Sequence, residues 1–277
     1  MNIFQSLEEP MSITLAGVSR ARMGFDRLLS IADGKSPELS AGGNRRSRDI
    51  FGDEIPRMQI TDGVAKIPVK GVIVRDWPTI AECFGFCDMA FVAEDIQTAL
   101  SRGVHTLAFD VDSPGGFSVA PYDAHDMIVD ARKTGTRTMA YSQGLLCSAA
   151  YDLVAGVHAV YITQGAEAGS IGTILSLTDD SEWMKQRGLK DVIFASGKYK
   201  AAGGEFPLPP DHRDYFQKRV MAIAEKFKSN VRAGRKMIQE EAMQGQSFIG
   251  QDAVAAGVAS AIVKNFEDSL ARFSRLK

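Results

Sequence analysis

The chain has 277 residues, 45% of them hydrophobic, which is enough to bury a full core in one or two domains. Lys and Arg total 32 against 34 Asp and Glu, so the formal net charge is only -2. That balance leaves no basic surface for nucleic acid or for an anionic membrane, and we expect neither partner.

The three cysteines, Cys83, Cys87 and Cys147, are an odd number and do not suggest a disulfide framework. Cys83 and Cys87 have no second pair of ligands nearby, so we predict buried thiols, no metal site and no cofactor. The N-terminus lacks a basic stretch followed by an apolar segment, and no run of 18 apolar residues occurs. We therefore expect a cytoplasmic protein without a membrane anchor.

Residues 1–57 are predicted to form an N-terminal extension. An apolar pattern over residues 18–31 predicts one helix, and residues 32–57 are rich in Gly, Ser, Asp and Arg, which is typical of a mobile linker. From residue 58 onward β-branched runs such as Val72-Ile73-Val74 indicate strands. We therefore predict a compact domain over residues 58–277.

Helices and strands alternate along this domain. The periodicity of apolar residues predicts helices over 88–100, 122–132, 148–155 and 211–235, and strands over 106–111, 137–141, 158–162 and 191–195. Such alternation is typical of an α/β domain with a largely parallel sheet, in which loops at the strand ends carry the chemistry.

Four loops of small residues follow predicted strands or open predicted helices. The first, Asp112-Ser113-Pro114-Gly115-Gly116, can turn sharply with exposed amides that could hold an oxyanion. The second places Ser148 where a loop enters an apolar helix, a position at which a lone serine is more often a cap. The third holds Ser170 between two glycines, and the fourth is Ser196-Gly197-Lys198-Tyr199-Lys200.

In their order and spacing these loops resemble the signal peptide peptidase (protease IV) family, and most closely its phage branch, the head or capsid-assembly proteases of lambda-like phages. The resemblance covers about residues 60–265 and includes a later segment, Phe248-Ile249-Gly250-Gln251-Asp252-Ala253, followed by Gly257. Many cellular members have two glycines after the nucleophile, whereas this chain has Ala149 and Ala150. That difference bears on substrate preference.

The resemblance implies a serine endopeptidase with Ser148 as nucleophile and Lys200 as general base. It also implies oxyanion donors from Gly115 or Gly116 and from the amide of Ser148, with Ser170 orienting the lysine. A lysine can act as a base only when it is neutral, which requires burial without a carboxylate partner. Residues 195–204 contain no Asp or Glu, and we therefore expect a buried lysine.

The resemblance further implies a Clp protease/crotonase-like fold of repeated ββα units and a homo-oligomer in closed rings. The expected substrates are scaffold or capsid proteins, met in the host cytoplasm or inside a procapsid. We also expect the linker, which contains Leu39-Ser40-Ala41-Gly42-Gly43, to be trimmed by the protein itself between about residues 36 and 50.

Several alternatives remain open from the sequence. Lys198 could replace Lys200 as the base, and Cys147 could replace Ser148 as the nucleophile. A Ser-His-Asp triad is disfavoured, because none of the four histidines stands in a comparable loop motif. At the level of function, the alternatives are a bacterial signal-peptide-peptidase-like protease, a crotonase-like acyl-CoA enzyme, and a non-catalytic shell protein in which Ser148 and Lys200 lie too far apart to touch.

Overall fold

A computed structural model describes residues 11–13, 54–55, 57–77, 81 and 84–276 of the chain. The helix predicted over residues 18–31, nearly all of the predicted linker, the expected trimming region and Cys83 lie outside the described residues. None of the helices in the described part of the chain is long and apolar enough to cross a membrane.

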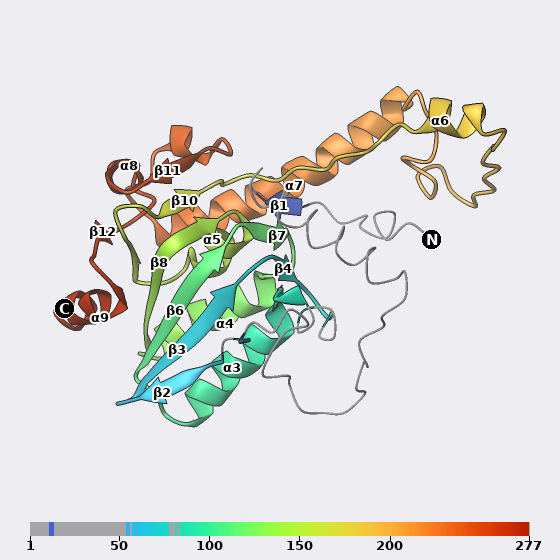
Figure 1. Ribbon diagram of the computed structural model, residues 1–277. Coiled ribbons are helices and arrows are strands. Elements are labelled where there is room, and N and C mark those ends of the chain that lie inside the picture. The colour runs from blue at the N-terminus through green and yellow to red at the C-terminus, as the bar shows by residue number, and fades with distance from the viewer. Residues whose placement is uncertain (1–10, 14–53, 56, 78–80, 82–83, 277) are drawn as a thin grey trace.

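An 8-stranded sheet forms the centre of the fold (Figure 1). Its main path runs β11-β10-β8-β6-β3-β2, with β9 pairing with both β8 and β12. The neighbours of β6 and β8 are all parallel to them, and only the two ends of the path, β2 and β11, pair antiparallel. The strands are β2 (Gln59–Thr61), β3 (Val64–Lys70), β6 (Thr106–Ser113), β8 (Arg137–Cys147), β9 (Ala159–Ile162), β10 (Glu167–Gly169), β11 (Ser247–Ile249) and β12 (Ala261–Ile262). The predicted α/β class with a largely parallel sheet is confirmed.

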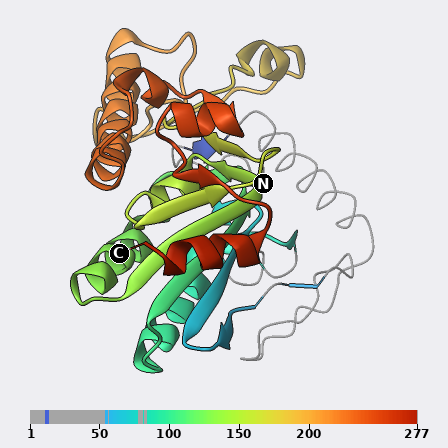
Figure 2. The same cartoon turned by 90° about the vertical axis from the view of Figure 1, so that its left-hand side faces the viewer.

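Helices cover both faces of this sheet. Residues alternate along β3, so that Ala65, Ile67 and Val69 face the main core beneath α3, α4 and α5. Figure 2 shows α9 lying across the opposite face, where Phe273 packs with Tyr141 of β8 in a second cluster. The helices are α3 (Met89–Ser101), α4 (Tyr122–Lys133), α5 (Ala149–Val154), α6 (Ser181–Gln186), α7 (Pro210–Gly234), the 3-10 turn η2 (Glu240–Met243), α8 (Gln251–Ala255) and α9 (Phe266–Ser274).

A smaller 4-stranded sheet, with the order β1-β7-β4-β5, is built from the ends of the ββα units. In each unit the first strand joins the large sheet and the second joins the small one: β3 and β4 precede α3, and β6 and β7 precede α4. The strands of the small sheet are β1 (Met11–Ile13), β4 (Ile73–Val74), β5 (Cys87–Asp88) and β7 (Gly115–Phe117). Asp88 also begins α3, because its carboxylate accepts a hydrogen bond of 2.9 Å from the amide of Ala90.

Residues 173–209, here called the arm, project beyond the sheet alongside the N-terminal half of α7 (Figure 1). The strand predicted over residues 191–195 is wrong, because this segment is irregular and lies within the arm. Its β-branched composition favours a strand, but a strand is stabilised by pairing with a neighbour, and these residues are exposed. The other predicted helices of the domain correspond to α3, α4, α5 and α7.

Candidate active site

Ser148 stands in a sharp turn between the end of β8 and the start of α5. Its backbone has φ 56 and ψ -125, a conformation that costs a residue with a side chain about 1–3 kcal/mol. It occupies the N-cap position of α5, yet its side chain makes no capping hydrogen bond. The hydroxyl is buried and finds no hydrogen-bond partner among the described residues. Strain and an unpartnered buried hydroxyl are features of a reactive group rather than of a helix cap.

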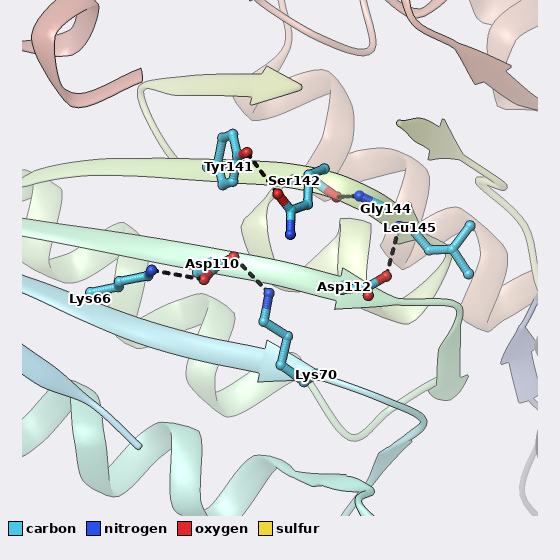
Figure 3. A network of polar contacts seen from close by, with 9 residues as sticks. Lys66, Lys70, Asp110, Asp112, Tyr141, Ser142, Gly144 and Leu145 are labelled. Carbon is cyan, nitrogen blue, oxygen red and sulfur yellow. Dashed lines mark hydrogen bonds and ion pairs between the residues drawn. The ribbon is translucent and has the colours of Figure 1, made fainter. Parts of the chain in front are cut away.

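An irregularity in the pairing of β6 and β8 positions this turn. Val111 pairs with Ser142 and Ser113 with Leu146, so β8 carries extra residues between these points. Asp112 fills the gap, because its carboxylate accepts a hydrogen bond of 3.0 Å from the amide of Leu145 (Figure 3). A side chain on Gly144 would lie 2.4 Å from the same carboxylate oxygen and would displace it.

This role of Asp112 was not predicted from the sequence, in which the residue only begins a glycine-rich loop. A carboxylate directly after a buried strand is the sequence signal for it. By holding Leu145, Asp112 fixes the last residues of β8 beside the loop that contains Gly115 and Gly116. Asp112 thereby helps to fix the position of the turn that holds Ser148.

Ser170 lies next to Ser148, because the strands that precede the two serines are paired. Cys147 of β8 pairs with Gly169 of β10, and each serine follows directly. Ser170 is also buried and also has a positive φ, of 53. Its amide donates to the carbonyl of Gln246 at 2.8 Å. The structure therefore brings Ser148 and Ser170 to one end of the sheet, as expected for residues of one site.

Two of the amides predicted as oxyanion donors already have partners in the described structure. The amide of Ser148 donates to the carbonyl of Gly169 at 2.8 Å, so pairing between β8 and β10 already uses it. The amide of Gly115 donates to the hydroxyl of Ser113 at 3.2 Å. Gly116 lies in β7, where a side chain would come within 2.0 Å of the carbonyl oxygen of Ile73.

Lys200 is exposed in the arm, so the expectation of a buried lysine is wrong for the single chain. Its neighbours attach this part of the arm to the beginning of α7: Tyr199 stacks on Tyr215 with ring centroids 4.8 Å apart. Asn230, near the other end of α7, contacts the helix that follows Ser148. At 1.5 Å per residue, Tyr215 and Asn230 are about 22 Å apart along the helix axis. A lysine side chain is far shorter than this, so Lys200 and Ser148 of one chain do not meet.

Lys198 is no better placed as a base. It is exposed and forms an ion pair of 3.0 Å with Asp211 in the first turn of α7. The hydrogen bond to Asp211 raises the pKa of Lys198, which favours the charged amine that cannot accept a proton. The ion pair therefore disfavours Lys198 as the base in the arrangement seen here.

The remaining alternatives for the catalytic groups are also disfavoured. Burial raises the pKa of the Cys147 thiol to about 12, which makes it an inert core residue, and Cys87 is buried in the same way. The ring of His125 contacts the carbonyl oxygen of Asp152 at 2.8 Å, and burial lowers its pKa. His125 therefore contacts the backbone of α5 and is not placed as a base for Ser148.

Polar contacts hold α5, the helix that Ser148 begins, from several sides. The carboxylate of Asp152 accepts a hydrogen bond of 2.8 Å from the side chain of Asn230 in α7. Burial raises the pKa of Asp152 to about 7, against the opposing effect of that hydrogen bond. The buried guanidinium of Arg235 donates to the carbonyl of Val157 at 2.9 Å, just beyond the helix. These contacts fix the direction in which Ser148 is presented.

The model of peptidase family S49 matches residues 130–277. The head-tail preconnector protein GP5 of Enterobacteria phage P21 is 26% identical over 96% of this chain and 52% of its own length. The capsid assembly protease C of Escherichia phage lambda is 27% identical over 77% of this chain and 50% of its own. A candidate signal peptide peptidase, SppA, of Enterococcus faecium is 24% identical over 72% and 59%. The chain thus spans about half the length of the curated relatives it matches.

Two solved structures complete the comparison. A variant of ClpP1 from Listeria monocytogenes gives a TM-score of 0.48 at 11% identity, over 73% of this chain and 93% of its own. The 1510-N membrane-bound stomatin-specific protease gives a TM-score of 0.42 at 15% identity, over 76% and 83%.

Proposed function

Because the chain belongs to peptidase family S49, we propose that it is a serine endopeptidase of phage head assembly, with Ser148 as its nucleophile and scaffold or capsid proteins as its substrates. The observation that carries the proposal is the strained Ser148, whose buried hydroxyl has no partner among the described residues. The two phage relatives support the setting in head assembly. Family membership favours peptide hydrolysis over acyl-CoA chemistry.

In this mechanism the hydroxyl oxygen of Ser148 attacks the carbonyl carbon of the scissile peptide bond, and a base accepts the hydroxyl proton. The negative charge that develops on the carbonyl oxygen needs amide donors. The amide of Ala149 supplies one, because it opens α5 and precedes the first hydrogen bonds within the helix. In this proposal the amide of Gly115 supplies the other, and it leaves its bond of 3.2 Å to the Ser113 hydroxyl when substrate binds. Ser170, beside the nucleophile, orients the incoming amine.

Lys200 is the base in this proposal, and a second copy of the chain supplies it. The arm that carries Lys200 exposes several large apolar side chains, as surfaces that bind another protein do. Phe194 is 93% exposed and Val192 68%, and the others include Ile174, Trp183, Leu189 and Ile193. Docking of the arm on a neighbouring copy would exclude water from the lysine, and the neutral amine is favoured where water is excluded.

Mixing two inactive variants tests this arrangement. Ser148→Ala and Lys200→Ala should each lose activity on a scaffold or capsid protein, and a mixture assembled after dissociation should regain about a quarter of the wild-type rate, since that share of sites receives both intact residues. Lys198→Ala is the matched control and should stay active.

The outcomes separate three readings of the chain. An inactive mixture beside an active wild type would place the base within the same chain. A wild type that cleaves nothing, and whose Ser148 does not react with a fluorophosphonate, would instead support a non-catalytic shell protein.

A further inference from the structure

The N-terminal segment of the chain forms a strand beside the candidate active site. Residues 11–13 make β1, which pairs antiparallel with β7 in the register Met11 to Phe117, Ser12 to Gly116 and Ile13 to Gly115. In the small sheet β7 lies between β1 and β4. Without β1, one edge of β7 would therefore present unpaired backbone groups.

The strand β7 runs close to Ser148. Ser113, two residues before β7, pairs with Leu146, two residues before Ser148. β7 itself contacts α5, the helix that Ser148 begins. A peptide whose carbonyl carbon reaches Ser148, and whose carbonyl oxygen reaches the Gly115 and Gly116 loop, must run alongside β7. Extended peptides bind such edges by adding a strand, through hydrogen bonds between main chains.

The nucleophile is closed to solvent in this arrangement. Ser148 is 1% exposed, and its hydroxyl oxygen has almost no accessible surface. A substrate cannot reach that oxygen unless a covering segment moves. The filled edge of β7 and the closed hydroxyl are separate observations, and both describe a site that is closed to a peptide.

We propose that β1 is an internal competitor of the substrate: it occupies the edge of β7 that takes the backbone of an extended peptide and must leave before cleavage begins. The proposal rests on the proposed peptidase function and adds a regulation to the same site. The competing ligand has a defined chemistry, an extended backbone that pairs antiparallel with Gly115–Phe117 and carries the sequence Met11-Ser12-Ile13.

The strand β1 is short enough to detach from β7 and return. Three residues offer few hydrogen bonds, each of modest net strength, so the strand can leave at low cost. Because β1 belongs to the same chain as β7, its effective concentration at that strand is on the order of millimolar. A dilute substrate is therefore excluded, whereas a substrate concentrated in an assembly displaces β1 by mass action.

Proline substitutions in the full-length chain test the inference. In an antiparallel pair, alternate residues direct their amides to the partner, so only one of Ser12 and Ile13 donates to β7. Proline has no amide hydrogen, so one of the two variants Ser12→Pro and Ile13→Pro removes the hydrogen bond that β1 donates and weakens its pairing with β7. The other variant leaves that hydrogen bond intact and is the matched control. The effective variant should lower KM for a small peptide substrate about fivefold at unchanged kcat, because one net hydrogen bond is lost from the competitor.

A binding measurement keeps this test independent of catalysis. In a Ser148→Ala background, a fluorescent peptide with the sequence of residues 9–16 should bind the effective proline variant about fivefold more tightly than it binds the chain with an intact β1. A peptide of scrambled sequence is the control. Equal affinity of the peptide for the Ser148→Ala chain and its two proline variants would overturn the inference. That result would leave the proposed peptidase function untouched. Tighter binding would support the inference even if no substrate were cleaved.

Discussion

Asn230, near the end of α7, donates a hydrogen bond of 2.8 Å to Asp152, one helical turn after Ser148. The helix that contains Asp152 has only six residues and would not form by itself. Its direction is therefore set by its contacts, and this one joins it to a helix of 25 residues. The other end of that long helix holds the arm with Lys200, through Tyr199 and Tyr215.

The first prediction concerns the stability of the chain as a function of pH. Burial raises the pKa of Asp152 from 3.8 to about 7 in the folded chain, so folding favours the protonated carboxyl. The contribution of this group to the free energy of unfolding is therefore fully present below about pH 4 and is lost as the pH rises towards 7. The loss should amount to roughly 4 kcal/mol at most. Asp152→Asn keeps an acceptor for Asn230 but cannot ionise. Urea unfolding at several pH values should show a drop for the wild type that is absent from the variant, and parallel curves for the two would contradict the prediction.

The second prediction concerns the strain at Ser148. Ser148→Ala removes a buried hydroxyl that has no partner, so it should raise the free energy of unfolding while activity disappears. Ser148→Gly should be more stable still, by about 1 kcal/mol, because glycine adopts the positive φ without a steric penalty. Thermal unfolding of the three proteins should give the order wild type, alanine, glycine. A glycine variant below the alanine variant would show that the backbone there is not strained.

The third prediction concerns the gap that Asp112 fills. Gly144→Ala would place a methyl group 2.4 Å from the Asp112 carboxylate and break its hydrogen bond to Leu145. We expect a loss of about 1–3 kcal/mol in stability and of at least about tenfold in kcat, since Ser148 would be displaced. Gly165→Ala is the matched control, because a side chain at Gly165 meets nothing within 4 Å. Equal effects of the two substitutions would argue against a positioning role for Asp112.

The fourth prediction concerns the arm. Phe194→Ser removes the most exposed large apolar side chain and should weaken self-association, with little change in the unfolding temperature of the separate chains. Specific activity should then fall most at low protein concentration. Ile249→Ser, which changes an exposed residue of β11 outside the arm, should leave association unchanged. Sedimentation velocity over a range of concentrations distinguishes the two variants.

The sequence predicted most of the parallel sheet, because strands depend on local patterns. Apolar runs such as residues 106–111 have few alternatives to a buried strand. The turn that holds Ser148 was recognisable between a strand and an apolar helix, whereas its assignment as nucleophile came from the family resemblance and stays a prediction. The helix over residues 211–235 was recognisable from its single apolar stripe and corresponds to α7.

The parts that could not be predicted depend on contacts between distant segments. The segment over residues 191–195 has the composition of a strand but finds no edge to pair with. The amide of Ser148 is used by Gly169, a fact that only the register of β8 and β10 fixes. The separation of Lys200 from Ser148 follows from the direction of α7, which no local pattern encodes.

Ser148 and Lys200 lie toward opposite ends of α7. The number of complete active sites in an assembly therefore depends on whether its subunits form an open row or a closed ring. In the proposed mechanism each copy lends its lysine to one neighbour and borrows from another. An open head-to-tail row of copies then always has one terminal serine that lacks a lysine, whereas a closed ring has none. The rate per subunit would therefore rise as a row lengthens and reach its full value when the last copy joins the first.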